Sequence, residues 1–141
     1  MKYVLDASVA LSWVMPRLHS AKALKLRDDY ISRIHDLIAP DIFYGETANA
    51  LTKAERQKLI PVGDASLLHV TILADCPNLQ SFFPLTPRAI EISSQTRTAF
   101  YDCLYVALAE QEQCEVVTVD DKFIKGVQKQ FPFVIHLTTL P

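Results

Sequence analysis

Four acidic residues lie where apolar segments enter or leave the predicted core: Asp6, Glu46, Asp102 and Asp120. Burying one ionised carboxylate without a partner costs several kcal/mol. That is a large share of the margin by which a domain is stable. Four such groups in one pocket therefore require a compensating positive charge.

Asp102 lies near the start of the segment AFYDCLYVALAEQEQ (99–113), whose first eleven residues are mostly apolar or aromatic. Residues three and four positions away share its helix face. For Asp102 these are Thr98, Ala99, Tyr105 and Val106, and for Glu46 they are Ile42, Phe43, Asn49 and Ala50. Both acids are predicted to point inward. The alternatives are a first-turn acid favoured by the helix dipole for Asp102, worth at most about 1 kcal/mol, and a solvated helix residue for Glu46.

Asp6 and Asp120 end the apolar segments KYVLD (2–6) and VVTVD (116–120). If these are neighbouring parallel strands, the two carboxylates lie roughly 5 Å apart. Carboxylates so close are stable only when they share a proton or a cation. The alternatives are a polar turn residue for Asp6 and a helix cap for Asp120. In the second case Asp121 shares or takes over the role of Asp120.

A divalent cation is the compensation that the sequence favours. Lys122 is the one basic residue near these acids. Carboxylate oxygens suit Mg²⁺ or Mn²⁺, which activate water and stabilise charge on a phosphate during in-line displacement. The pattern predicts phosphodiester hydrolysis, with Asp6, Asp102 and Asp120 as metal ligands and Glu46 as a further catalytic acid. Ser8 and Thr118 are candidates to hydrogen-bond the carboxylates or a metal-bound water, with capping and strand pairing as competing roles.

Strands and helices alternate along the chain. Strands are predicted at 2–6, 36–40, 79–85, 115–119 and 133–137. Helices are predicted at 9–15, 19–34, 41–59, 64–76, 86–96, 97–113 and 121–131, with Asp41, Asp64, Thr86 and Thr98 as capping residues of four of them. Apolar strands covered on both faces predict a three-layer α/β/α sandwich with a mainly parallel sheet of four to five strands. One domain over 1–141 fits this length.

The formal net charge of −2 excludes a broadly basic nucleic-acid coat. Local basic strips remain: Arg97, Lys122 and Lys125 flank the third and fourth acids, and Arg17, Lys22, Lys25, Arg27 and Arg33 lie on the early helices. Each strip is either a contact for phosphates or an acidic partner, or an ordinary solvated face. Because the net charge is slightly negative, any affinity for RNA is expected to be modest and salt-sensitive.

The cysteine pattern and the absence of a long apolar run predict a soluble cytoplasmic protein. Cys76, Cys103 and Cys114 form an odd set without CxxC spacing, as expected of reduced thiols. No apolar run approaches the roughly 18 residues of a membrane helix. The four histidines have no metal-ligand spacing, and only three glycines are present, with no glycine-rich phosphate loop.

Four motifs give the chain a resemblance to the PIN-domain ribonucleases and, within them, to the VapC-type toxins of toxin–antitoxin pairs. VLDASVAL (4–11) resembles the opening motif, with Asp6 and Ser8, and ETANAL (46–51) the second, with Glu46, Asn49 and Leu51. YDCLYVALAE (101–110) is similar to the third, with Asp102, and VVTVDDKF (116–123) to the last, with Thr118, Asp120 and Phe123. The doubled acid at Asp121 and the thiol of Cys103 are the departures.

The resemblance implies a Mg²⁺- or Mn²⁺-dependent endoribonuclease that dimerises and is inhibited by a small antitoxin protein. Three alternatives remain open. Two are a stand-alone PIN nuclease without an antitoxin and a catalytically idle PIN-like scaffold. The third is a receiver-like module that accepts a phosphoryl group on an aspartate, but such a module needs an acid after the middle strand and a lysine after a late strand. The predicted strand LQSFFPL (79–85) ends without an acid, and no late strand ends in lysine.

Overall fold

Five parallel strands form one sheet, and the computed structural model describes every residue from 1 to 141. The strands lie in the order β3-β2-β1-β4-β5, and all four neighbouring pairs are parallel. Their bounds are Lys2–Leu5 (β1), Asp36–Pro40 (β2), Asn78–Gln80 (β3), Glu115–Thr118 (β4) and Val134–His136 (β5). The predicted mainly parallel sheet is confirmed.

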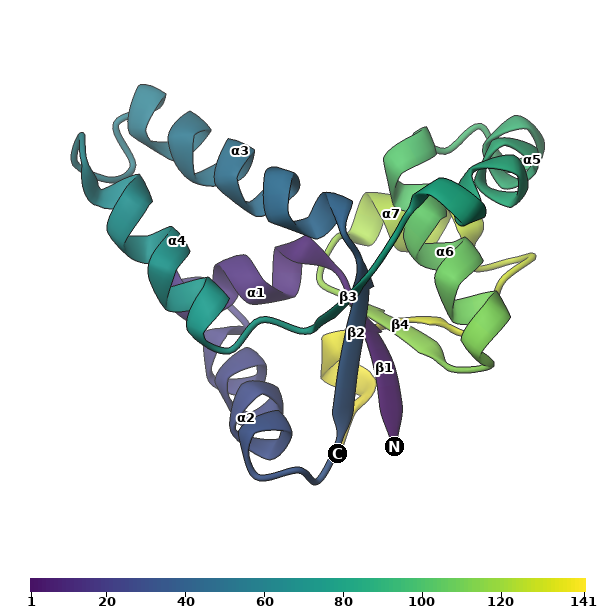
Figure 1. The fold of residues 1–141 in the computed structure, drawn as a ribbon, viewed down its shortest axis with the longest axis horizontal. Coiled ribbons are helices and arrows are strands. Elements are labelled where there is room, and N and C mark those ends of the chain that lie inside the picture. The colour runs from purple at the N-terminus through teal and green to yellow at the C-terminus, as the bar shows by residue number, and fades with distance from the viewer.

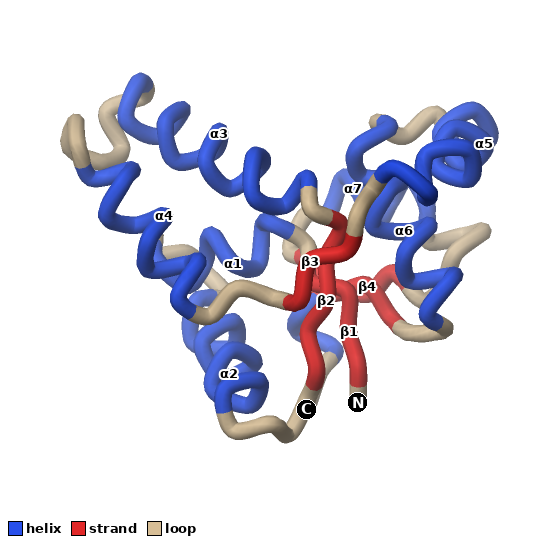
Figure 2. Tube along the Cα trace, in the orientation of Figure 1, coloured by secondary structure: helices blue, strands red, loops and turns tan.

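Helices cover both faces of the sheet, which confirms the three-layer α/β/α sandwich. They are α1 (Ala7–Val14), α2 (Ser20–Ile31), α3 (Ile42–Arg56), α4 (Asp64–Ala74), α5 (Thr86–Thr96), α6 (Phe100–Glu112) and α7 (Asp121–Val127). Helix α1 packs against β4 and against α2, α3 and α4, whereas α6 packs on β1, β2 and β4 and carries α5 on its outer side. Figure 2 shows the two groups of helices with the strands between them.

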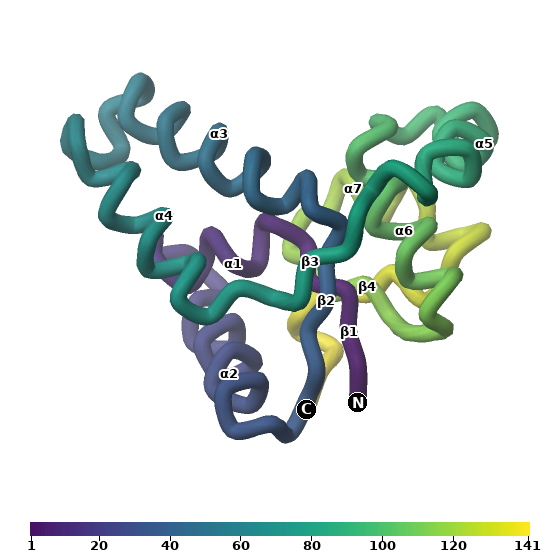
Figure 3. The backbone as a smooth tube through the Cα atoms, in the orientation of Figure 1, coloured from purple at the N-terminus to yellow at the C-terminus, as the bar shows by residue number.

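The direction of strand addition reverses between β1 and β4. From β1 the chain adds β2 and β3 on one side, and it later adds β4 and β5 on the other. Ligands of such sheets bind beyond the carboxyl ends of the strands at this reversal. Asp6 follows β1 there, and its backbone N–H donates to the carbonyl of Val117 in β4 at 3.1 Å. Figures 1 and 3 show the α3–α4 pair and the α5–α7 group diverging on either side of this end of the sheet.

The start of α4 differs from the prediction, because Asp64 is not its cap. The helix begins after Gly63, whose positive φ of 99° is readily adopted only by glycine. The carboxylate of Glu55 on α3 accepts hydrogen bonds from the backbone N–H groups of Gly63 (2.8 Å) and Ala65 (2.9 Å). A side chain from the neighbouring helix thus does the work that local capping patterns assign to Asp64.

Three other predicted caps are also wrong in their contacts. Asp41 precedes α3, but its carboxylate accepts from the backbone N–H of Phe82 at 3.0 Å. Thr86 lies inside α5, and Ala99 rather than Thr98 precedes α6. At Asp41 a contact with a distant loop replaces the local cap, whereas the hydroxyl of Thr86 donates to the nearby carbonyl of Phe82 at 3.3 Å.

The predicted strand 79–85 is wrong beyond Gln80. Residues Phe83–Leu85 form a short 3₁₀-helix instead. Pro84 has no backbone N–H to donate to a strand ladder, and its fixed φ suits the start of a helical turn. The ladder to β2 accordingly stops at the Pro40–Gln80 pair.

The interior is a single apolar cluster on both faces of the sheet. Trp13 and Met15 belong to it, and the indole N–H of Trp13 donates to the carbonyl of Ala23 at 3.0 Å. All three cysteines are free thiols, and only Cys103 is fully buried. None of the helices is long and apolar enough to span a bilayer.

Candidate active site

Asp6 is a buried carboxylate held by two hydroxyl groups. Its Oδ2 accepts hydrogen bonds from Ser8 Oγ at 2.5 Å and from Thr118 Oγ1 at 2.8 Å. Burial raises the pKa of Asp6, and the charge of Asp120 raises it further, while the two hydroxyls oppose the shift. Of the two roles considered for Ser8 and Thr118, the structure has both hydroxyls bound to the carboxylate.

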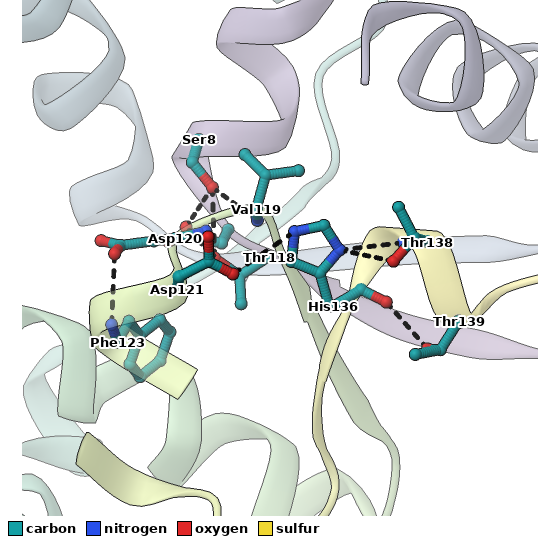
Figure 4. A network of polar contacts seen from close by, with 10 residues as sticks. Ser8, Thr118, Val119, Asp120, Asp121, Phe123, His136, Thr138 and Thr139 are labelled. Atoms are coloured by element: carbon teal, nitrogen blue, oxygen red, sulfur yellow. Dashed lines mark hydrogen bonds and ion pairs between the residues drawn. The ribbon is translucent and has the colours of Figure 1, made fainter. Parts of the chain in front are cut away.

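The turn after β4 joins Asp120 to the same network. Ser8 Oγ accepts the backbone N–H of Val119 at 3.2 Å, and Thr118 Oγ1 accepts that of Asp120 at 3.0 Å (Figure 4). Asp120 also caps α7, because its Oδ1 accepts the backbone N–H of Phe123 at 3.1 Å. This contact fixes the side chain and leaves Oδ2 without a hydrogen bond.

Asp121 points away from this network. Its side chain is 92% exposed, and its Oδ1 lies 3.8 Å from Nε2 of His136 on β5 (Figure 4). The geometry therefore favours Asp120 over Asp121 as the acid that faces the carboxyl end of the sheet. The expected sharing of a role between the two adjacent acids has no contact to support it.

Glu46 reaches the site from α3 and is held by Tyr105 on α6. The Tyr105 hydroxyl donates to Glu46 Oε1 at 2.7 Å, across the carboxyl end of the sheet. Burial raises the pKa of Glu46, the Tyr105 hydrogen bond opposes this, and the charge of Asp6 adds to it. Tyr105 itself is fully buried, and burial together with the surrounding acids holds its pKa well above the usual value.

Asp102 experiences the charges of all three other acids. Its pKa is raised from 3.8 to about 7, first by burial and then by Asp6, Glu46 and Asp120, with Lys122 opposing the shift. The charges of Asp6 at the end of β1, Glu46 on α3 and Asp120 at the end of β4 thus all act on the carboxyl group of Asp102 on α6. The structure brings together the four acids on which the sequence argument depends.

The donors at this site fit a hard divalent cation. They are carboxylate oxygens in a partly buried, mutually repulsive group with one nearby lysine, which is the chemistry that Mg²⁺ and Mn²⁺ satisfy. No three acidic, histidine or cysteine side chains form a ready group of metal ligands as they stand. Uncompensated carboxylates repel one another, so drawing them onto one ion requires side-chain rotation.

The basic residues flanking the third and fourth acids lie together. Arg97, Lys122 and Lys125 line an open cavity of about 720 Å³ that Asp102 and Asp120 also line. The second strip, on α2 and its flanking turns, is separate from this cavity, since Lys22 and Lys25 line a different pocket with Tyr3 and His35.

Two outcomes at the site differ from what the sequence suggested. Asn49, which the resemblance places in the second motif as a residue supporting the site, is exposed, and its side chain makes no hydrogen bond. Tyr105 was given no role, although it lies three residues after Asp102 on the same helix face. A buried tyrosine hydroxyl usually has a hydrogen-bond partner. This rule could have indicated from the sequence that Tyr105 binds a polar group at the site.

Known proteins resemble this chain over most or nearly all of its length. The sequence model of the PIN domain family matches residues 3–127. The ribonuclease VapC3 of Pyrobaculum aerophilum is 26% identical over 137 residues, which are 96% of this chain and 98% of that protein. Among solved structures, PAE2754 from Pyrobaculum aerophilum has a TM-score of 0.69 at 23% identity, covering 99% of this chain and 94% of that one. VapBC2 from Rickettsia felis, bound to a DNA fragment from its promoter, has a TM-score of 0.66 at 15% identity, covering 96% and 97%.

Proposed function

The chain belongs to the PIN domain family and is VapC-like over nearly its whole length, and from this premise we propose that it is a metal-dependent endoribonuclease, the toxin of a toxin–antitoxin pair. The observation that carries the proposal is the cluster of Asp6, Glu46, Asp102 and Asp120. Asp6 is buried, Glu46 and Asp102 are half-buried, and burial together with acidic neighbours raises the pKa of each of these three. Carboxylates held in this way destabilise a fold unless they serve a charged ligand.

The residues divide the work by their surroundings. Asp6, Asp102 and Asp120 are the ligands for Mg²⁺ or Mn²⁺, and Ser8 and Thr118 orient Asp6 through their hydroxyl groups. The cation supplies charge stabilisation for the phosphate and lowers the pKa of a bound water. Glu46 Oε1 is engaged by Tyr105, so Oε2 is the oxygen that accepts the proton of the attacking water. The raised pKa of Glu46 suits that transfer.

Three partners follow from the same proposal. The substrate is RNA, cleaved by the single domain 1–141 in the cytoplasm. A small antitoxin protein holds the toxin inactive, and the toxin acts as a homodimer. Support for an antitoxin comes from the likeness to VapBC2, whose name denotes a toxin–antitoxin complex. Expression of this chain alone is therefore expected to arrest growth, and unimpaired growth would favour a stand-alone nuclease.

The direct test is cleavage of single-stranded RNA by the purified protein. We expect cleavage with Mg²⁺ or Mn²⁺, none with EDTA, and recovery when excess Mn²⁺ is restored. Products are resolved on a denaturing gel, with a protein carrying Asp6→Asn purified in parallel to exclude a contaminating nuclease. Cleavage that persists in EDTA, or in the Asp6→Asn protein, contradicts the proposal.

Tyr105→Phe is expected to lower the rate of cleavage by about 10- to 100-fold, the usual effect of losing a residue that orients a site carboxylate. The hydroxyl is the only group that hydrogen-bonds Glu46, so its loss frees that side chain to rotate and raises its pKa further. Rates are measured across a pH series. A shift of the pH–rate profile to higher pH indicates the change in the pKa of Glu46, which a general loss of stability would not produce.

Tyr30→Phe is the matched control for Tyr105→Phe. It also removes a hydroxyl that makes one hydrogen bond, here to the carbonyl of Cys76 at 2.9 Å. This contact lies at the amino end of the sheet, opposite the end that carries the acids. Equal rate losses in the two variants would show that Tyr105 has no particular function at the site.

A further inference from the structure

The cavity beside the acids lies between two segments of the chain. One wall is the loop between α5 and α6, with the start of α6, and the other is α7. Its volume of about 720 Å³ is within the range of ligand pockets, roughly 300–1,000 Å³, so it is large enough for a nucleotide. Asp102 and Asp120 also line it, so a ligand that fills the cavity contacts two of the four acids.

The cationic side chains of three residues line this cavity beside the carboxylates of Asp102 and Asp120. The side chains of Arg97, Lys122 and Lys125 form no ion pair and donate no hydrogen bond, unlike those of Lys2, Lys25, Arg27 and Arg88, each of which is paired with a carboxylate. The guanidinium of arginine matches phosphate oxygens in a two-pronged geometry, and lysine adds a mobile point charge. This combination is that of a site for a phosphodiester.

The fold holds the two walls close together. Gly126 faces Thr98, and a side chain at position 126 would begin only 2.6 Å from Thr98 Oγ1. Lys122 lies one helical turn before Gly126 on the same face of α7, so it turns toward the loop that carries Arg97. Thr98 is itself anchored, because its carbonyl accepts the hydroxyl of Ser93 at 2.6 Å. The spacing of the three cations is therefore built into the packing of α7 on this loop.

We propose that this cavity binds the RNA backbone phosphate next to the one that is cleaved, together with its nucleoside. This subsite rests on the proposed function, since the acids that line part of the cavity define where cleavage takes place. It makes Arg97, Lys122 and Lys125 substrate-positioning residues, and it means that the enzyme needs at least one phosphate beyond the reacting one. Binding energy from the neighbouring phosphate then holds the reacting phosphate against the acids.

The backbone at Arg97 allows a clean test. Arg97 has a φ of 59°, a left-handed conformation that glycine adopts without strain. Arg33 has a φ of 62°, is likewise exposed at a helix end, and lies before β2, at the opposite end of the sheet from the acids. Arg97→Gly and Arg33→Gly therefore remove the same charge and relieve the same backbone strain, and neither is expected to lower the melting temperature.

Binding is measured by fluorescence anisotropy of a labelled random-sequence RNA a dozen nucleotides long, in EDTA, over a series of salt concentrations. Arg97→Gly is expected to weaken binding about three- to tenfold and to reduce the slope of log K against log salt by about 0.7, the value for one lost contact to a single strand. Arg33→Gly is expected to match the wild type. Lys125→Gln on α7, paired with Lys129→Gln in the turn that follows α7 and outside the cavity, repeats the comparison.

Cleavage with Mg²⁺ by the same proteins separates the two proposals. An increase in KM with little change in kcat for Arg97→Gly and Lys125→Gln supports the subsite. If the wild type does not cleave but the cavity variants still bind RNA more weakly than their controls, the proposed nuclease fails and the phosphate site stands. If the wild type cleaves and each cavity variant binds RNA as its control does, the subsite is wrong, and the cavity is left for an acidic segment of a protein partner.

Discussion

Replacing Asp102 by asparagine is expected to abolish RNA cleavage and, in the absence of metal, to raise the melting temperature. Loss of one carboxylate ligand removes the cation, whose stabilisation of transition-state charge is worth several kcal/mol, or about a thousandfold in rate. Asparagine keeps the shape of the side chain. It removes the repulsion among Asp102, Asp6, Glu46 and Asp120 and the cost of burying the charge. Activity and thermal unfolding of the same preparation measure both effects.

Asp64→Asn is the control for the stability half of this prediction. Asp64 is also an acid in the first turn of a helix, α4, but it is remote from the cluster. If helix-dipole stabilisation explained both residues, each substitution would lower the melting temperature. An increase for Asp102→Asn with a decrease for Asp64→Asn assigns Asp102 to the cluster. A loss of stability at Asp102, or full activity, contradicts the account.

The stability gained by Asp102→Asn is expected to grow with pH. The folded-state pKa of Asp102 is about 7, above the ordinary value of 3.8, so the folded protein holds a proton that the unfolded chain releases. At low pH Asp102 is protonated in both the folded and the unfolded state, so its carboxyl group costs no stability. The cost grows as the pH rises from 3.8 to about 7 and applies in full above pH 7. The melting temperatures of wild type and Asp102→Asn should nearly coincide at the acidic end and separate toward neutral pH.

A divalent cation is expected to reverse this difference. Above pH 7 Asp102 is ionised. Binding of Mg²⁺ or Mn²⁺ there stabilises the wild type by about 2.7 kcal/mol when the cation is at a hundred times its dissociation constant. NaCl at equal ionic strength is the control for screening. The Asp102→Asn protein should gain much less from the cation. A difference between the two proteins that is independent of pH, or equal stabilisation of both by Mg²⁺, would remove the electrostatic basis of the site.

The positions of the acids followed from local sequence patterns. Asp6 and Asp120 end apolar strands, and parallel strands bring their carboxyl ends to one edge, so their proximity required only the correct fold class. Asp102 and Glu46 were placed by the apolar residues around them on their helices. Patterns with a fixed period, two for strands and 3.6 for helices, carry enough information for such assignments.

Contacts that join distant segments could not be predicted in this way. The cap of α4 comes from Glu55 on α3, and the partner of Glu46 is Tyr105, fifty-nine positions along the chain. Asp41, a capping residue by its type, instead fixes the loop at Phe82. The convergence of Arg97 with Lys122 and Lys125 likewise depends on the close packing of Gly126 on Thr98. Each of these depends on how helices meet, which no local window of sequence contains.

The central claim is that Asp6, Asp102 and Asp120 share a divalent cation, and anomalous diffraction from crystals grown with Mn²⁺ above neutral pH tests it most directly. The account predicts an anomalous peak at the carboxyl ends of β1 and β4, within coordination distance of oxygens from these three side chains. Crystals with Mn²⁺ bound elsewhere on the surface, and with the four carboxylates turned apart and metal-free, would contradict it.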